Sequence, residues 1–297
     1  MLKLTLSLDT AYTRYMIVDF HTHIFPPGLK EERQRYSAVD ATFRALYGDP
    51  KTAIASAEDL LASMDSEGVD VSVVMGVGWT DLGLAREAND YIIESVRSHS
   101  TRLVGFCGVN PAWGEEACQE IQRCAHAGVK GVGELHPDSQ GFDLSDKRVM
   151  APIAEAARSL DLLVLTHASE PVGHQYTGKG RTTPDVLGRF IDNFPDLTIV
   201  CAHWGGGLPF YGLMPEVSTA LKNTYFDTAA SPYLYDPQVF STVASILGAD
   251  KVLLGSDFPL LRQGRLLKQV RSAALTNEAR AAILGGNAAN LLGLSYA

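Results

Sequence analysis

The sequence predicts an α/β protein that folds as one (β/α)8 barrel, the TIM-barrel architecture. Three observations predict it. Eight short β-rich segments alternate with longer helical patterns along the 297 residues. Several of these segments are continuously apolar, which is typical of parallel strands buried on both faces. Histidine or aspartate residues also end or follow several of the segments, and in such barrels functional side chains gather at the carboxyl ends of the strands.

The predicted strands are short and distributed over the whole chain. They cover residues 16–20, 71–75, 103–107, 131–135, 162–166, 198–202, 225–228 and 252–255. We expect residues 1–15 to be an N-terminal extension and residues 16–297 to form a single barrel domain. Residues 25–55 are too many for an ordinary loop between a strand and a helix, so we expect a helical insertion over the barrel mouth after strand 1.

Local signals place helices between the strands. Ser56 and Asp59 have the spacing of a capping box, which predicts that a helix begins here. Thr183 precedes Pro184, a cap residue before a proline at the first helical position. The apolar residues after it recur every three or four positions, as on one buried helix face. Residues 287–292 predict a terminal helix after a turn at two glycines.

Composition and charge exclude several classes of partner. The net charge of −9 and the lack of a basic cluster disfavour nucleic acids and anionic membranes, and no apolar run reaches the length of a membrane span. We therefore expect a small-molecule substrate; a homo-oligomer is compatible with the sequence but not required by it. The four cysteines form no C-x-x-C pair, so we expect reduced thiols in a cytoplasmic protein.

Metal-ligating residue types occur at the ends of several predicted strands. His21 and His23 are spaced i, i+2 on strand 1, so both imidazoles leave on the same face. His167, His203 and Asp257 directly follow strands 5, 6 and 8. Each could singly be a structural polar residue, but all of them at one rim indicate a hydrolytic centre of the Zn²⁺ type.

Other residues near this rim are candidates for substrate contact or for a metal bridge. Glu134 ends strand 4, where it could bridge two metals or bind substrate; a buried acid paired with a cation is an equal alternative. The candidate substrate-binding residues are Trp79, His136, Arg181, Trp204 and Arg262. The two arginines lie in loops of the catalytic rim and indicate a carboxylate-bearing substrate, although solvated loop charges explain them equally well.

The chain resembles the amidohydrolase superfamily, in the branch of aminocarboxymuconate-semialdehyde decarboxylase and related metal-dependent hydrolases. The segments on which this resemblance rests are DFHTH at 19–23, TH at 166–167, FPDLTIVCAHWGG at 194–206, GSDFP at 255–259 and GNAANLLGL at 286–294. The resemblance implies that His21, His23, His167 and Asp257 bind one divalent metal, usually zinc, and that His203 is an unliganded acid/base or carbonyl-polarising residue. The chain departs from this branch at Glu134, where many relatives carry lysine. In other branches a glutamate there joins two metals, so one or two ions remain open.

Two reactions fit this set of residues. The leading prediction is a hydrolase in which Asp257 takes a proton from metal-bound water and His203 stabilises the oxyanion of an amide, ester or lactone. The alternative is a zinc-dependent, non-oxidative decarboxylase or another lyase with the same ligands. A metal-binding protein without catalysis is disfavoured, because a structural site needs no additional histidine.

Overall fold

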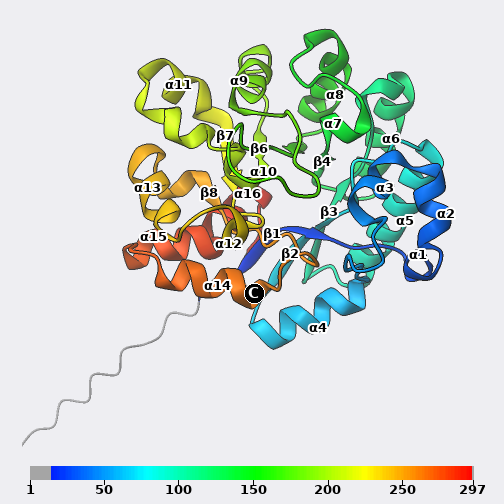
Figure 1. Ribbon diagram of the computed structural model, residues 1–297, viewed down its shortest axis with the longest axis horizontal. Coiled ribbons are helices and arrows are strands. Elements are labelled where there is room, and N and C mark those ends of the chain that lie inside the picture. The colour runs from blue at the N-terminus through cyan, green and yellow to red at the C-terminus, as the bar shows by residue number, and fades with distance from the viewer. Residues whose placement is uncertain (1–14, 296–297) are drawn as a thin grey trace, which may run out of the picture.

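The computed structural model describes residues 15–295, in which eight parallel strands form a barrel surrounded by helices (Figure 1). Each strand pairs with the next one in the chain, in the order β1 to β8. The strands are β1 Val18–His23, β2 Val71–Met75, β3 Leu103–Cys107, β4 Gly131–Leu135, β5 Leu163–Thr166, β6 Ile199–Cys201, β7 Thr224–Asp227 and β8 Val252–Leu253. The predicted barrel is confirmed. Most predicted strand bounds hold within two residues, although β1 extends three residues further and includes His21 and His23.

The ring closes between the last strand and the first. Thr22 and Phe258 form a parallel bridge, Phe20 N donates to Leu254 O at 2.6 Å, and Asp257 N donates to His21 O at 2.9 Å. This closure matters for the site, because it brings residues more than 230 positions apart in the chain to neighbouring points on the rim.

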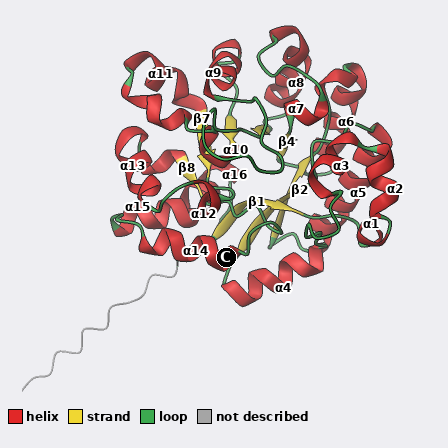
Figure 2. Cartoon of the chain, in the orientation of Figure 1, coloured by secondary structure: helices red, strands yellow, loops and turns green. Residues whose placement is uncertain are grey.

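Helices cover the outside of the strands (Figure 2). They are α1 Gly28–Glu31, α2 Arg33–Val39, α3 Ala41–Tyr47, α4 Ala57–Glu67, α5 Leu82–Ser98, α6 Glu115–His126, α7 Pro137–Gln140, α8 Lys147–Ser159, α9 Pro184–Asn193, α10 Ala202–Gly205, α11 Pro215–Ala220, α12 Ser231–Leu234, α13 Gln238–Leu247, α14 Gln263–Ser272, α15 Asn277–Ala281 and α16 Asn287–Leu292. Short 3₁₀ turns lie at Pro111–Trp113, Leu208–Leu213, Leu221–Asn223 and Ala249–Lys251, and one π turn lies at Ala282–Gly286.

Large apolar side chains fill the barrel interior. Phe20 of β1 and Phe106 of β3 meet edge to face, with ring centroids 5.7 Å apart. Ala288 and Leu292 of α16 belong to the same buried cluster and contribute to its packing. The interior is therefore a packed core, and the polar side chains of the candidate site gather at the carboxyl ends of the strands.

The segment after β1 forms the expected helical insertion, α1 to α3. Phe43 of α3 stacks on Trp79 with ring centroids 5.9 Å apart, and Phe25 packs edge to face on Tyr47. This aromatic cluster fastens the insertion to the loop after β2 and holds Leu46 and Tyr47 at the cavity.

Of the two helix starts predicted from capping residues, one has the predicted side-chain cap and the other does not. Ser56 and Asp59 form the predicted capping box at the start of α4. Thr183 precedes α9, but its hydroxyl donates to Asp185 rather than capping the helix. The predicted extension lies, except for Tyr15, outside the described residues. No helix in residues 15–295 has the length and apolar character to span a membrane.

Candidate active site

The i, i+2 histidines of β1 converge as the strand alternation predicts. His21 and His23 are 0% and 3% exposed, and their Nε2 atoms are 3.1 Å apart. His23 Nδ1 donates to the Gly76 carbonyl at 2.8 Å, so the unprotonated nitrogen of a neutral His23 is Nε2. His21 Nδ1 is 2.8 Å from Asp227 Oδ2 at the end of β7. Both rings are thus oriented by an acceptor that leaves Nε2 for the centre.

The environment of His21 favours the protonated, positively charged form of its imidazole. Burial alone lowers the pKa of this imidazole, but the nearby carboxylates, Asp227 foremost and then Glu134, hold the pKa well above its usual range. Asp227 is itself fixed, because its Oδ1 accepts from the backbone N–H groups of His203 and Ala229 at 3.0 Å each. A buried carboxylate therefore positions His21 and the backbone of His203 together.

Asp257 follows β8 and faces the two histidines. Its Oδ1 lies 3.3 Å from His23 Nε2 and 3.9 Å from His21 Nε2. Burial raises the pKa of this carboxyl, but His23 and His21 outweigh that effect and lower it. Asp257 has φ +68°, a left-handed conformation that is unfavourable for aspartate and typical of functional positions. Asp19 supports this turn by accepting from the Ser256 hydroxyl and backbone N–H.

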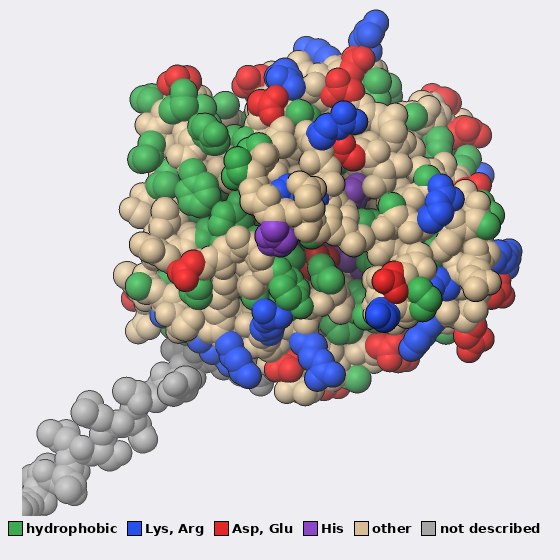
Figure 3. Space-filling model, in the orientation of Figure 1, with side chains coloured by type: hydrophobic (Ala, Val, Ile, Leu, Met, Phe, Trp, Pro, Cys, Tyr) green, Lys and Arg blue, Asp and Glu red, His purple; other side chains and the backbone are tan. Residues whose placement is uncertain are grey.

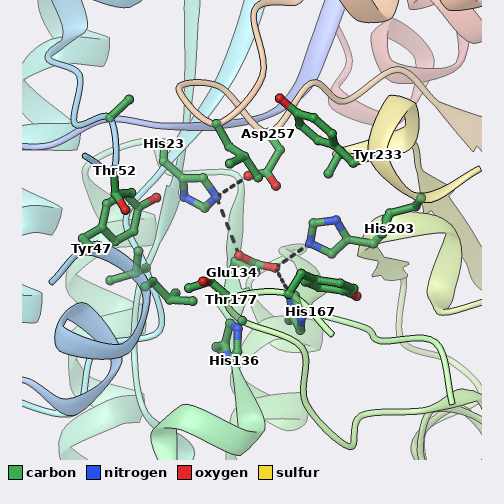
Figure 4. Close-up of a pocket in the computed structure, with 18 of the residues that line it drawn as sticks. His23, Tyr47, Thr52, Glu134, His136, His167, Thr177, His203, Tyr233 and Asp257 are labelled. Atoms are coloured by element: carbon green, nitrogen blue, oxygen red, sulfur yellow. Dashed lines mark hydrogen bonds and ion pairs between the residues drawn. The ribbon is translucent and has the colours of Figure 1, made fainter. Parts of the chain in front are cut away.

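Glu134 at the end of β4 lies between two groups of side chains (Figure 4). Its Oε2 is 3.7 Å from both His21 Nε2 and His23 Nε2. Its Oε1 is 3.0 Å from His167 Nδ1 and 3.6 Å from His203 Nε2. Burial raises the pKa of this carboxyl, but the surrounding histidines, His167 and His203 foremost, hold it well below its usual range. Glu134 is therefore an anion shared by both groups.

His203 projects into the site from a sharp reversal after β6. His203 and Trp204 both have left-handed backbone conformations, with φ +54° and +58°, and glycines follow them. His203 Nδ1 donates to Ala229 O at 3.1 Å, which turns Nε2 toward Glu134. Burial lowers the pKa of this imidazole, but Glu134 and Asp257 outweigh it and raise the pKa to about 9. His203 therefore holds a proton at neutral pH.

The donor atoms fit a divalent cation. His21, His23 and Asp257 form one group with metal-ligand spacing, and Glu134, His167 and His203 form a second. Ligand atoms about 2.1 Å from one ion are about 3.0–3.5 Å apart, and the distances within the first group are 3.1 to 3.9 Å. The two Nε2 atoms face each other at 3.1 Å, so a proton on His21 Nε2 bridges them, and a cation can take the place of that proton. The predicted ligand His167 belongs instead to the second group.

A cavity of about 410 Å³ opens above these side chains. In the space-filling view of this face, histidine side chains lie in and beside a central hollow (Figure 3). The apolar and phenolic part of its wall comes from the insertion and from the loops after the strands, namely Leu46, Tyr47, Ala53, Val77, Tyr176, Ala230, Tyr233, Leu234 and Leu260. This volume and lining are those of a small-molecule site.

The five predicted substrate-binding residues are placed differently. His136 lines the cavity, 2% exposed, and stacks on His167 at 4.1 Å between ring centroids. Trp79 and Trp204 are fully buried in apolar clusters outside the cavity lining. Arg181 is 96% exposed at its side chain, beside Asp138, and Arg262 is exposed at the start of α14. Neither arginine lines the cavity.

Sequence reasoning missed Asp227 and the tyrosines of the wall. Asp227 ends a predicted strand, so the strand-end rule that selected Asp257 could have found it. Tyr47, Tyr176 and Tyr233 carry no such signal, because they lie in the helices and loops that follow the strands, and only the tertiary structure turns them toward the cavity.

Comparison with known proteins identifies the family. The family model described as amidohydrolase matches residues 18–294. The chain belongs to the amidohydrolase family. The match includes the whole barrel and all the strand-end residues described above, in the amidohydrolase-2 branch that the sequence resembles.

Several relatives of this amidohydrolase-family protein have named activities. 2-Amino-3-carboxymuconate-6-semialdehyde decarboxylase of Dictyostelium discoideum is 24% identical over 95% of this chain and 92% of its own length. The structure of 5-carboxyvanillate decarboxylase from Sphingomonas paucimobilis is 20% identical, with TM-score 0.78, and covers 95% of this chain and 100% of its own. A dihydroxybenzoic acid decarboxylase from Polaromonas sp. JS666, with bound manganese and 2-nitroresorcinol, is 19% identical, with TM-score 0.70 and coverage of 96% and 98%.

These findings correct the leading prediction of a hydrolase. The relatives named above are decarboxylases, which favours the alternative, a decarboxylase or lyase. The prediction failed for a chemical reason. The same histidines and carboxylates can serve either reaction, and the choice depends on the bond that the substrate presents to them.

Proposed function

We propose that this amidohydrolase-family protein is a metal-dependent, non-oxidative decarboxylase of a small carboxylic acid. The observation that carries the choice of reaction is the full-length relationship to a curated decarboxylase. The cavity supports it, because buried cation-attracting side chains lie at its base and apolar and phenolic side chains surround the remaining space.

We propose that His21, His23 and Asp257 hold one divalent ion, with Glu134 Oε2 as a further donor. Zn²⁺ suits this mixed nitrogen and oxygen set, and a solved relative carries manganese. When bound, the ion supplies positive charge that attracts the substrate carboxylate and stabilises electrons released from it. His167 supports the centre through Glu134, which it contacts at 3.0 Å.

His203 is proposed as the proton donor. The bond between the carboxylate carbon and its neighbour breaks, CO₂ leaves, and the electron pair that remains on the neighbouring carbon takes a proton from His203 Nε2. The Nδ1 hydrogen bond to Ala229 keeps the ring in place while Nε2 loses this proton and regains one from water. No oxidant is needed.

His136 is proposed to bind an uncharged polar group of the substrate. Neither of its ring nitrogens has a partner within the described structure, although the side chain is buried. An unpaired buried imidazole is unfavourable, and a hydroxyl group of the ligand would satisfy it. Burial and the neighbouring His167 lower the pKa of His136 to about 3, so the ring is neutral and offers one donor and one acceptor.

The test is product analysis with the metal-loaded protein. Hydroxylated benzoates with one carboxylate, including 2,6-dihydroxybenzoate, are incubated beside a panel of amides, esters and lactones, and released CO₂ is measured together with hydrolysis products. We expect metal-dependent CO₂ release and about one divalent ion per chain. Water-consuming cleavage without CO₂ would end the decarboxylase proposal. Two ions per chain would place the second at Glu134, His167 and His203 and remove His203 as a free acid.

A further inference from the structure

The cavity wall has an unusual distribution of charge. Its lining, within residues 15–295, includes two carboxylates, Glu134 and Asp257, and contains neither lysine nor arginine. The two carboxylates lie at the base, where they match the two positive charges of the proposed ion. The remainder of the wall is apolar, phenolic or uncharged, apart from the histidines.

Two cations near the wall, Arg33 and Lys179, are engaged outside the lining. Arg33 donates to the backbone carbonyls of Tyr47, Asp49 and Thr52 at 2.6 to 2.8 Å, and so supports the insertion. Lys179 Nζ donates to carbonyl oxygens of Val172 and His174.

Two further rim cations have contacts outside the lining, and the exposed Arg262 lies outside the lining as well. Arg181 is exposed beside Asp138. The Arg265 guanidinium lies on the Tyr233 ring, 4.4 Å from the centroid. These basic residues stabilise the loops that form the wall, and none of them lines the cavity.

The phenols of the wall respond to the same negative environment. Burial raises the pKa of Tyr47 well above its usual range, and Asp257 and Glu134 raise it further. Tyr176 donates its hydroxyl to Glu170 Oε2 at 2.8 Å, and burial and this carboxylate raise its pKa as well. A second anion in this space would find neither lysine nor arginine as a partner, because the proton of His203 is already matched by the first carboxylate, and it would have several carboxylates as neighbours.

We propose that the cavity selects carboxylic acids with a single negative charge and rejects those whose body carries a second carboxylate. The inference rests on the proposed function, which places the one tolerated carboxylate at the base beside Glu134 and Asp257. It names the substrate class as a monocarboxylate with an uncharged, largely apolar or hydroxylated body. Leu46 of α3 is the specificity-determining position, because it is an apolar residue of the insertion that lines the cavity opposite no cation.

The first test compares 3-nitrobenzoate with benzene-1,3-dicarboxylate. The two ligands have nearly the same shape and differ by one charge, and neither needs to react. Binding to the metal-loaded protein is measured by calorimetry at neutral pH. We expect 3-nitrobenzoate to bind at least about 100-fold more tightly, because an unpaired buried charge is strongly unfavourable. Equal or tighter binding of the dicarboxylate would overturn the inference.

The second test supplies the missing cation. Leu46→Lys is compared with Leu46→Met, a matched uncharged replacement of similar length. We expect the lysine variant to bind benzene-1,3-dicarboxylate at least about tenfold more tightly than the methionine variant does, with 3-nitrobenzoate little changed. Equal dicarboxylate affinity in the two variants would count against Leu46 and against the charge argument. Because both tests measure binding, they are independent of whether CO₂ is released.

Discussion

The two ends of the cavity are built in opposite ways. The base consists of strand-end residues such as His21, His23 and Asp257, all at most 9% exposed. The outer wall consists of insertion and loop residues, among which Tyr233 and Leu260 are 46% and 57% exposed. At the base each imidazole is oriented by a neighbouring carboxylate or carbonyl, whereas much of the wall contributes shape and apolar surface.

This difference indicates that the base determines the reaction and that the outer wall determines which ligand binds. Strand ends in a closed barrel move little, so they hold donor atoms within a few tenths of an ångström. Loops and insertions tolerate substitution, so they can change the shape and charge of the cavity without disturbing the base. Changes at the base should therefore affect metal content and kcat, and changes in the wall should affect KM and ligand choice.

The largest effect is expected for His23→Ala at the base. Removing its Nε2 takes one of the three donors from the group that it forms with His21 and Asp257, so metal should be lost and kcat should fall at least about 10³-fold. His174→Ala is the matched control, because His174 also lines the cavity but lies in the loop after β5. Metal analysis and steady-state kinetics decide; equal losses in both variants would contradict the division between base and wall.

The next effect is expected for His203→Asn. Asparagine can keep a polar contact with Glu134 but cannot donate a proton, so kcat should fall about 10²-fold while metal content is unchanged. Loss of metal together with activity would identify His203 as a ligand and remove it as the acid. The measurement is metal content and kcat on the same preparation.

A smaller, ligand-dependent effect is expected for His136→Leu. If His136 binds a substrate hydroxyl, this variant should bind 2-hydroxybenzoate about tenfold more weakly and benzoate almost normally. A merely structural role would change both affinities together. Competition binding with the metal-loaded wild type and variant separates these outcomes.

The smallest effect is expected for Asp138→Asn, which loosens the wall. Asp138 Oδ2 accepts from Arg181 N, Thr182 N and Thr182 Oγ1, and thereby anchors the loop that carries Tyr176. Burial raises the pKa of Asp138, but these hydrogen bonds outweigh it and lower the pKa below its usual range. The ionised carboxylate thus stabilises the folded state above the unfolded pKa, and this contribution disappears as pH falls through the folded pKa.

For this variant we expect about 1 kcal/mol less unfolding free energy at pH 7 and a higher KM with kcat nearly unchanged. The difference from wild type should vanish in acid, below the folded pKa of Asp138. Denaturant titrations at neutral and acidic pH measure it. A difference that is constant with pH would show that the ionised carboxylate is not its source.

The fold could be predicted from the sequence because a barrel strand is buried on both faces and is therefore mostly apolar. The apolar segments 71–75, 103–107 and 131–135 coincide with β2, β3 and β4. The rim residues could be predicted as well, since a residue that directly follows a parallel strand must lie at the carboxyl edge of the barrel. His21, His23, His167, His203, Asp257 and Glu134 all lie there.

The partners of those residues needed the tertiary structure. The pairing of His21 with Asp227 joins β1 to β7, and no local pattern specifies which strand end meets which imidazole. The aromatic and basic candidates show the same limit, since Trp79 turns into the core of the insertion and Arg181 remains outside the cavity. The sequence by itself determined which chemical groups reach the rim, because strand burial and alternation are local. Only the folded chain decided which of them face one another and which charges the cavity lacks, because side-chain direction in loops depends on packing between distant segments.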